Sequence, residues 1–414
     1  MAAAPLPFAR FAAAAVADAA RHFPVLLVTG ARQVGKTTML RTLAKPSRSY
    51  VTLDDPLQMR LAREDPALFV QTHPPPLLID EIQYAPGLLP HIKMAVDQRK
   101  RPGDYWLTGS QPFPLMHGVA ESLAGRVAVL RLLGLSRREQ LRLPKTPPFL
   151  PKPELLARLR RSGRPADDMR TLFARIWRGS YPALAAQPTM GRDLFFASYL
   201  QTYLQRDVRD LARVGDEASF VRFIRAAAAR TAQLLNLAEL ARDADVAPNT
   251  AKAWLSILEI SGVVHLLQPW HANITKRLVK TPKLYVLDTG LCSWLTQWTS
   301  PQTLQAGAMA GAIFETWVIA ELLKSHLNAG LQTPFYYFRN KDQYEIDLLI
   351  DADGLLYPVE IKKSASPGRD ALRGINALAK LGVALGPGAV LCMVPESVPL
   401  GGTPSVVAVP AGLL

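Results

Sequence analysis

The sequence predicts a multidomain α/β protein with a parallel sheet near its N-terminus. In the stretch "PVLLVTGARQVGKTTMLRTLA", an apolar strand is followed by a glycine-containing loop and then by a helical pattern. From residue 135 to about 215 the apolar residues have helical spacing, and after residue 300 a long amphipathic helix precedes three strand-like runs. A chain of 414 residues also exceeds the size at which a single core stops growing, so we expect several domains.

The composition is that of a folded protein, with 49% apolar and 20% charged residues. The formal net charge of +14 indicates a polyanionic partner, with nucleic acid as the first candidate; the alternative is arginine that only solvates helix faces. Cys292 and Cys392 lack metal-ligand spacing, which favours a reducing, cytoplasmic location. No run approaches the roughly 20 apolar residues of a spanning helix, so no membrane partner is expected.

The first motif is a phosphate-binding loop. Gly30, Gly35, Lys36 and Thr37 fit the spacing G-x-x-x-x-G-K-[ST] between a strand and a helix. The glycines let backbone N–H groups close around phosphate oxygens, and the following helix N-terminus favours an anion. We therefore expect ATP and Mg²⁺ as cofactors, with Lys36 on the outer phosphates, Thr37 on the metal ion and Thr38 beside them.

Two further strands end in polar residues that suit the same chemistry. The run "PPPLLIDEIQYAP" ends a strand in Asp80, which would hold the Mg²⁺ shell, and in Glu81, which would orient or deprotonate the attacking water. The run "DYWLTGSQ" ends in Ser110, a candidate sensor of the γ-phosphate. An acidic pair at a strand end could also cap a helix, but a phosphate-binding loop in the same domain favours the catalytic interpretation.

After these strands, "ESLAGRVAVLRLLGLSRREQ" places Arg126 before another apolar run. The order of phosphate-binding loop, Asp-Glu strand, polar strand end and Gly-Arg resembles the AAA+ ATPase core, here residues 1–140. That resemblance implies that Arg126 is an arginine finger acting on ATP of a neighbouring subunit, which requires a homo-oligomer such as a hexameric ring. The alternative is a surface or lid arginine, and the sequence leaves action within one subunit open.

The middle of the chain is expected to hold two small units. Residues 141–215 are helical in pattern with a proline-rich interruption, which suits a lid and linker. In this unit, the pair Arg206–Asp207 either senses nucleotide or only solvates a helix. Residues 216–295 contain two amphipathic helices joined by a short turn, followed by strand-like runs, which predicts a winged-helix DNA-binding domain.

In that predicted winged helix, Asn249 is expected to cap the second helix. Asn249, Thr250 and Lys252, with Trp254 near them, are expected to face a DNA groove. The phosphate contacts are expected from the basic residues of the wing, which are Lys276, Arg277, Lys280 and Lys283. The alternative is a domain that packs on the ATPase core or mediates assembly, with a solvated basic loop.

The last unit, residues 300–414, carries a second set of acidic residues. A helix bears Glu315, one strand bears Asp347, and the next bears Glu360 and Lys362, which share a face because strand side chains repeat with period two. Carboxylates suit Mg²⁺, with Asp347 and Glu360 as ligands, and an ammonium can steady a water nucleophile. The set resembles the PD-(D/E)xK nuclease superfamily, whose fold is restriction-endonuclease-like, although "EID" replaces the leading Pro-Asp.

Across nearly the whole chain, the sequence resembles an uncharacterised prokaryotic ATP-binding family in which an AAA core precedes a domain of unknown function. The phrases that carry this resemblance are "SYVTLDDP", "LLIDEIQYAP", "LTGSQ", "SLAGRV", "YLQRDV" and "LYVLDTG". The leading hypothesis is an ATPase that binds and remodels branched or broken duplex DNA as an oligomer. The alternatives are an ATP-regulated, Mg²⁺-dependent endonuclease and a nucleotide switch in defence or signalling whose C-terminal domain is not catalytic.

Overall fold

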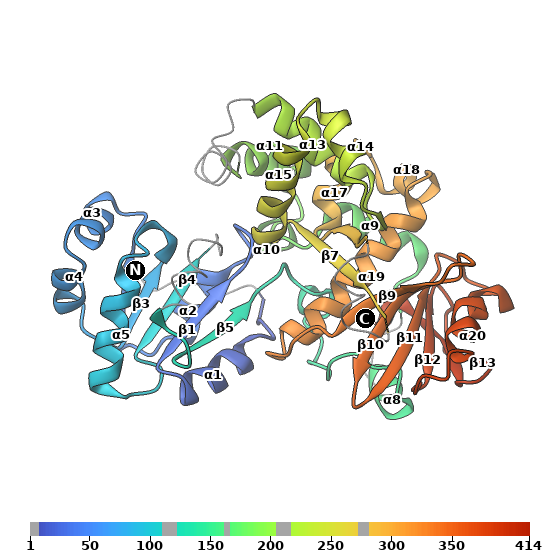
Figure 1. Cartoon of the computed structure of the whole chain (residues 1–414), viewed down its shortest axis with the longest axis horizontal. Helices are drawn as coiled ribbons and strands as arrows, with labels where there is room; N and C mark the ends of the chain where they lie inside the picture. The colour runs from blue at the N-terminus through green and yellow to red at the C-terminus, as the bar shows by residue number, and fades with distance from the viewer. Residues whose placement is uncertain (1–7, 110–121, 161–165, 204–216, 272–280) are drawn as a thin grey trace.

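The computed structural model describes residues 8–109, 122–160, 166–203, 217–271 and 281–414 (Figure 1). In this part of the chain, the N-terminal sheet has five strands in the order β2-β3-β4-β1-β5, and every pairing is parallel. The strands are β1 (Val25–Thr29), β2 (Ser49–Thr52), β3 (Leu77–Asp80), β4 (Tyr105–Gly109) and β5 (Val127–Arg131). Because the strands are parallel, the loops that follow β1, β3 and β4 meet at one edge of the sheet.

Helices cover this sheet, which is blue and cyan in Figure 1. They are α1 (Ala13–His22), α2 (Lys36–Leu43), α3 (Pro56–Glu64), α4 (Pro66–Thr72) and α5 (Leu88–Arg99), with a 3₁₀ turn at Ile82–Tyr84. Side chains of β1 alternate between two cores: Val25 and Leu27 lie in a core confined to the N-terminal unit, whereas Leu26 and Val28 lie in one that continues into the rest of the chain. The sheet is therefore joined to the other units through one of its faces.

The segment after β5 is helical, as the sequence predicts. Its helices are α7 (Arg137–Gln140), α8 (Pro153–Arg160), α9 (Met169–Arg178), α10 (Pro182–Ala186), α11 (Arg192–Tyr203), α13 (Glu217–Ala229), α14 (Leu237–Ala244) and α15 (Pro248–Ile260). A short turn joins α14 to α15. The expected N-cap at Asn249 is wrong: α15 begins at Pro248 with Ala247 as its N-cap, since proline lacks an N–H and its fixed φ suits the first helical position.

The second sheet is the main departure from the expected organisation. In the described residues its order is β13-β14-β12-β11-β10-β9-β7-β8-β6. Its strands are β6 (Gln233–Leu234), β7 (Val264–Pro269), β8 (Lys283–Val286), β9 (Phe335–Arg339), β10 (Glu345–Ala352), β11 (Leu355–Ile361), β12 (Gly388–Cys392), β13 (Val398–Gly401) and β14 (Val406–Pro410). Because β7 pairs in parallel with β9, the strands expected in two separate domains form one sheet.

After β8 the described part of the chain forms further helices. They are α17 (Thr289–Leu295), α18 (Pro301–Ala306), α19 (Ala310–Leu327) and α20 (Arg373–Ala379), with short 3₁₀ turns at Arg369–Leu372 and Ala411–Leu413. Helix α19 is buried along most of its length because the sheet and the helical segment both pack on it. Among the described residues, no helix combines the length and apolar character needed to cross a membrane.

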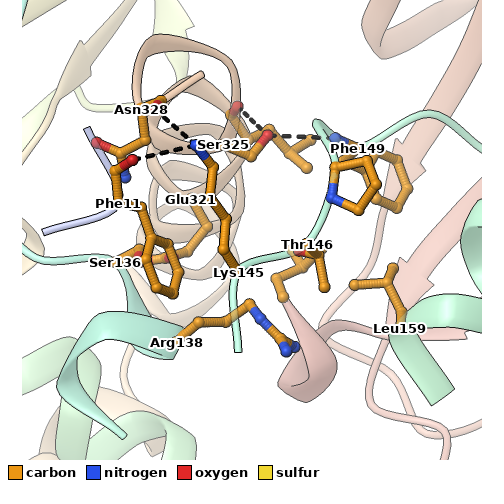
Figure 2. Close-up of a pocket in the computed structure, with 13 residues that line it drawn as sticks. Phe11, Ser136, Arg138, Lys145, Thr146, Phe149, Leu159, Glu321, Ser325 and Asn328 are labelled. Atoms are coloured by element: carbon orange, nitrogen blue, oxygen red, sulfur yellow. Dashed lines mark hydrogen bonds between the residues drawn. The ribbon is translucent and has the colours of Figure 1, made fainter. Parts of the chain in front are cut away.

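Helix α19 also docks on the loop that leaves the N-terminal sheet. Glu321 of α19 accepts a hydrogen bond from the backbone N–H of Arg137 at 2.9 Å. Lys145 donates to the carbonyl oxygens of Phe11 at 3.1 Å and Asn328 at 3.2 Å, as Figure 2 shows. The cavity between these residues has a volume of about 40 Å³, which is too small for a nucleotide.

Candidate nucleotide site and a buried carboxylate cluster

The loop between β1 and α2 has the geometry that its glycines require. Gly30 has φ of +145°, and a Cβ there would lie 2.0 Å from the carbonyl oxygen of Leu132. Gly35 has φ of +89° and is the N-cap of α2, which begins at Lys36. Both conformations are rare for residues with side chains, so the two glycines allow the loop to turn its backbone toward the helix N-terminus.

The predicted phosphate and metal ligands converge at this edge of the sheet. Lys36 Nζ donates to the carbonyl oxygens of Gly30 and Ala31, both at 2.9 Å. Thr37 Oγ1 donates to Asp80 Oδ1 at 2.7 Å, so the hydroxyl and the carboxylate expected in the Mg²⁺ shell are already in contact. Oxygen donors of this kind fit a hard divalent cation, and Lys36, Thr37 and Asp80 are the residues that would hold Mg²⁺ and the phosphates.

Two neighbours fix the carboxylate of Asp80. Tyr50 on β2 donates its hydroxyl to Asp80 Oδ2 at 3.1 Å, and the Thr108 hydroxyl on β4 donates to Asp80 Oδ1. Burial, followed by the negative charge of Asp80, raises the pKa of Tyr50 to about 12, so the phenol keeps its proton. Sequence reasoning missed Tyr50, although it lies in the quoted phrase "SYVTLDDP".

Glu81 has a backbone conformation that turns it toward the nucleotide cavity. Its φ of +58° is left-handed, its backbone N–H donates to Thr108 Oγ1 at 3.1 Å, and the Gln83 amide donates to its carboxylate. A strained conformation at a non-glycine residue is typical of functional sites. The expected γ-phosphate sensor Ser110 and the pair Arg206–Asp207 lie outside the described residues.

The cavity over these residues has a volume of about 520 Å³, a size that suits a nucleotide. It is lined by Arg32, Gln33, Gly35, Lys36, Thr37, Thr38, Glu81 and Thr202. Thr202 comes from the end of α11 and was missed by sequence reasoning, since no local pattern indicates that this helix reaches the phosphate-binding loop. The helical segment therefore contributes to the wall of the nucleotide cavity.

Arg126 lies at the opposite edge of the sheet. It precedes β5, and its carbonyl oxygen accepts a hydrogen bond from Val25 at the start of β1. The phosphate-binding loop follows the end of β1, about 16 Å away along the strand at about 3.3 Å per residue. Arg126 also pairs with Asp97 through two bonds of 2.6 and 3.1 Å, and this pairing raises its pKa. It is not placed to reach ATP of its own subunit, so only action on a neighbour stays a prediction.

The C-terminal acidic residues form a buried cluster with a cation at its centre. Lys283 Nζ lies 3.1 Å from Glu315 Oε1, 2.6 Å from Glu345 Oε1 and 3.4 Å from Asp347 Oδ1. Lys283 is only 3% exposed, so the prediction that it contacts DNA phosphates is wrong. Lys283 is the first residue of β8, and its ammonium lies against acids of α19 and β10, so it is not part of a solvated loop.

Glu360 and Lys362 lie at the side of this cluster. Lys362 Nζ is 2.6 Å from Glu360 Oε1, and the buried Glu360 Oε2 has no hydrogen-bond partner among the described residues. Burial, followed by the charge of Asp347, raises the pKa of Glu360 to about 8 and that of Glu315 to about 7. Groups so close to one another titrate together.

The predicted metal ligands Asp347 and Glu360 do not form a metal site here. In the part of the chain that the structure describes, no three His, Cys, Asp or Glu side chains are grouped to hold a metal ion. The ammonium of Lys283 takes the position among the carboxylates that a cation would need. Sequence reasoning also missed Glu345, which the two-residue strand period could have placed on the face of Asp347.

The second helix of the predicted winged helix presents a polar stripe. Asn249 and Lys252 are exposed and Thr250 is half-buried. Trp254 does not face a groove: it is 4% exposed and packs edge-on against Phe220 and Phe223, with ring centroids 5.1 and 5.6 Å away. The expected phosphate contacts Lys276, Arg277 and Lys280 lie outside the described residues.

The other end of α15 reaches the nucleotide site. Gly262, in the turn after this helix, has φ of +75°, and a Cβ built on it would lie 3.5 Å from the backbone nitrogen of Ala31. The same Cβ would lie 3.7 Å from the guanidinium of Arg131. The exposed stripe and the phosphate-binding loop are therefore at opposite ends of one helix.

Comparisons with known families agree with this architecture. A model described as an AAA domain matches residues 22–141. Two models described as domains of unknown function match residues 169–302 and 310–413. Among solved structures, the Walker-type ATPase PABY2304 of Pyrococcus abyssi is 14% identical with a TM-score of 0.40, covering 69% of this chain and 94% of that one. RuvB of Thermotoga maritima is 17% identical with a TM-score of 0.30, covering 61% and 85%.

Curated relatives match over most of the chain. The uncharacterized protein Rv2008c of Mycobacterium tuberculosis is 34% identical over 365 residues, which cover 86% of this chain and 74% of the relative. The uncharacterized protein Mb2031c of Mycobacterium bovis matches with the same identity and coverage. The fold is thus α/β with a P-loop ATPase core, and in this chain the AAA domain is followed by domains of unknown function. The chain belongs to the family of these uncharacterized mycobacterial proteins.

Proposed function

We propose that the protein hydrolyses ATP with Mg²⁺ and uses this reaction to bind and remodel DNA as an oligomer. The observation that carries the ATPase part is that Lys36, Thr37 and Glu81 line one cavity of about 520 Å³, while Asp80 accepts a hydrogen bond from Thr37 beside it. These residue types at the carboxyl edge of a parallel sheet match the needs of phosphoryl transfer, in which positioning and charge stabilisation dominate.

Each of these residues has a separate role in ATP hydrolysis. Lys36 Nζ donates hydrogen bonds to the carbonyl oxygens of Gly30 and Ala31, and when ATP binds it would donate to phosphate oxygens in their place. Thr37 and Asp80 would hold Mg²⁺, which neutralises charge on the phosphate oxygens. Glu81 would orient the attacking water and accept its proton, and the hydrogen bond from Gln83 keeps the carboxylate in place.

For DNA binding, the support is the exposed stripe of α15 together with the net charge of +14. Asn249, Lys252, Ala253 and Ser256 are all exposed and follow the spacing of one helix face. The small residues in this stripe would let a DNA backbone approach, and Lys252 would contact a phosphate. The turn after α15 lies beside the phosphate-binding loop, so DNA at one end of the helix would influence the nucleotide at the other.

The first experiment measures ATP hydrolysis with and without single-stranded, duplex and branched DNA in Mg²⁺. Glu81→Gln should bind ATP normally and lose at least 100-fold in hydrolysis rate, because general-base catalysis contributes about 10²–10⁴-fold. Lys252→Glu should lose DNA stimulation, whereas Lys380→Glu, an exposed lysine at the end of α20, should keep it. A rate that no DNA changes in the unmodified protein would contradict the DNA part of the proposal.

For the oligomer, Arg126 is proposed to leave Asp97 and act on ATP of a neighbouring subunit. Arg126→Ala should keep ATP affinity but lower hydrolysis by at least tenfold, because arginine fingers act on the transition state. Asp97→Ala, which removes the other half of the pair, should leave hydrolysis intact. If Arg126→Ala and Asp97→Ala behave alike, Arg126 is only half of a surface ion pair.

A nucleotide switch is the second candidate, favoured by the buried contacts between the loop after β5 and α19. Backbone Arg137 and the side chain of Lys324 both bond to Glu321, and Lys324 also donates to the carbonyl oxygen of Leu135 at 3.1 Å. In a switch, hydrolysis would be slow and independent of DNA, and ATP-bound and ADP-bound forms would differ in oligomeric state. Measuring the oligomeric state by sedimentation with ATP and with ADP distinguishes the nucleotide switch from the DNA-remodelling ATPase.

A further inference from the structure

The centre of the C-terminal cluster is Lys283, which comes from outside the C-terminal segment. It stands at the start of β8, and β8 joins the C-terminal strands through β7 and β9. The side-chain ammonium lies within 3.4 Å of carboxylate oxygens of Glu315, Glu345 and Asp347, which come from α19 and β10. An expected surface residue is thus the cation that links three segments of the fold.

The number of partners matches the chemistry of an ammonium. A lysine Nζ carries three N–H donors and here has one carboxylate for each of them. The carboxylates have further donors: the Tyr285 hydroxyl bonds to Glu315 Oε1 at 2.7 Å, and the Ile361 backbone N–H bonds to Asp347 Oδ2 at 2.9 Å. Glu315 and Asp347 therefore accept hydrogen bonds from the chain itself as well as from Lys283.

A divalent cation does not fit this arrangement. Mg²⁺ requires near-octahedral oxygen ligands at about 2.0–2.1 Å, and a positive charge already lies among the carboxylates. The remaining acid, Glu360, is engaged by Lys362 at 2.6 Å. The four acidic groups are thus divided between two lysines, so they are not left together for a metal ion.

We infer that Lys283 is a built-in cation that takes the place of the metal ion, and that this centre is an ionic clamp joining β8, α19 and β10 and does not cleave DNA. The inference concerns the C-terminal unit alone and does not depend on the proposed ATPase. It predicts that the acidic cluster becomes a divalent-cation site only when Lys283 is removed. Glu315, Glu345 and Asp347 then lose their shared counter-charge, although Glu345 keeps another cation near it, Arg339 at 3.6 Å.

The test measures the binding of Mn²⁺ to full-length, nucleotide-free protein by calorimetry. The unmodified protein and Asp347→Asn should bind Mn²⁺ equally, so that any binding at the phosphate-binding loop cancels in the comparison. Lys283→Met should bind one additional Mn²⁺ ion, with an affinity at least tenfold higher than that of any site in the unmodified protein. Combining Lys283→Met with Asp347→Asn should abolish this additional binding. The unmodified protein should leave supercoiled plasmid intact in Mg²⁺ or Mn²⁺.

Two results would overturn the inference: Mn²⁺ binding by the unmodified protein that Asp347→Asn removes, or plasmid cleavage that Asp347→Asn removes. Lys283→Met that folds without gaining Mn²⁺ would also count against it. Lys283→Arg is the matched control, because it keeps the charge and should fold without gaining Mn²⁺. If Lys283→Met fails to fold while Lys283→Arg folds, the requirement for a charge at this position supports the clamp.

Discussion

Arg10 is the residue at which a single substitution tests how the phosphate-binding loop is held. Its guanidinium donates to the carbonyl oxygen of Val34 in that loop at 2.6 Å, to that of Leu133 at 2.7 Å, and to Glu139 at 3.1 Å. The side chains of Arg10 and Glu139 are 3% and 0% exposed. Arg10→Met would keep the volume of the side chain but remove all three donors.

The expected loss of stability follows from this burial. Removing one partner of a buried ion pair costs about 3–5 kcal/mol, because the other charge is left without compensation. Glu139 retains bonds from the backbone N–H groups of Phe11 and Ser136, both at 2.7 Å, so we expect the lower end of this range, about 3 kcal/mol. ATP affinity should also fall, since the Val34 carbonyl loses its anchor.

The assay is urea unfolding followed by tryptophan fluorescence, together with ATP binding by calorimetry. Arg21→Met is the matched control, because Arg21 pairs with Asp18 on the surface, with exposures of 72% and 61%, and such pairs contribute about 0–1 kcal/mol. Arg10→Met combined with Glu139→Gln should recover part of the loss, because the unpaired buried charge is gone. A loss for Arg10→Met no larger than that for Arg21→Met would refute the reasoning.

Three further substitutions test separate features. Gly30→Ala should lower the ATP affinity measured by calorimetry at least tenfold, or about 1.4 kcal/mol, because the new Cβ would lie 2.0 Å from a backbone oxygen. Gly87→Ala should leave the affinity unchanged, because a Cβ there would have no atom within 4 Å. Burial, followed by a nearby arginine, lowers the pKa of His265 to about 4, so the unfolded chain binds the proton first as pH falls from 7 to 5. Unfolding at these two pH values should show a loss of about 2 kcal/mol that His265→Gln removes. Trp254→Ala should cost about 3–5 kcal/mol in urea unfolding, and Asn249→Ala less than about 0.5 kcal/mol.

The nucleotide site could be predicted because its determinants are local. Gly30, Lys36 and Thr37 lie within one loop and helix start, and Asp80 ends a strand whose apolar run is visible in the sequence. Parallel strands then bring these segments to the same edge without any knowledge of side-chain packing. The contact between Thr37 and Asp80 follows from topology alone.

The carboxylate cluster could be predicted only in part. Asp347 and Glu360 stand out as acids in apolar strands, but the position of Lys283 depends on the pairing of β7 with β9, which no local pattern specifies. The sequence around Lys283 is rich in basic residues, which predicts a wing that contacts DNA phosphates. Composition describes a segment as a whole, whereas burial is decided residue by residue in the folded chain.

The contacts around the phosphate-binding loop differ in the free energy needed to break them. On one side, Arg10 ties Val34 to Glu139 of α7, and the backbone N–H of Arg137 in the same helix donates to Glu321 of α19. These are buried, charged hydrogen bonds, so moving the loop relative to α19 would break contacts that contribute several kcal/mol.

On the other side, the ends of α11 and α15 lie near the loop. The charged contact at the end of α15 is between Glu259 and Arg131 at the end of β5, outside the loop. Thr202 of α11 lines the nucleotide cavity, and Gly262 lies so near Ala31 that a Cβ added to it would be only at van der Waals distance, 3.5 Å from the Ala31 nitrogen. Contacts of this kind contribute only about 0.1–0.2 kcal/mol per atom pair and can be exchanged at small cost. A nucleotide-dependent change should therefore appear first at the ends of α11 and α15, while the junction with α19 stays fixed. Hydrogen exchange measured with and without ATP would separate the two regions, and equal changes in α15 and α19 would contradict this ranking.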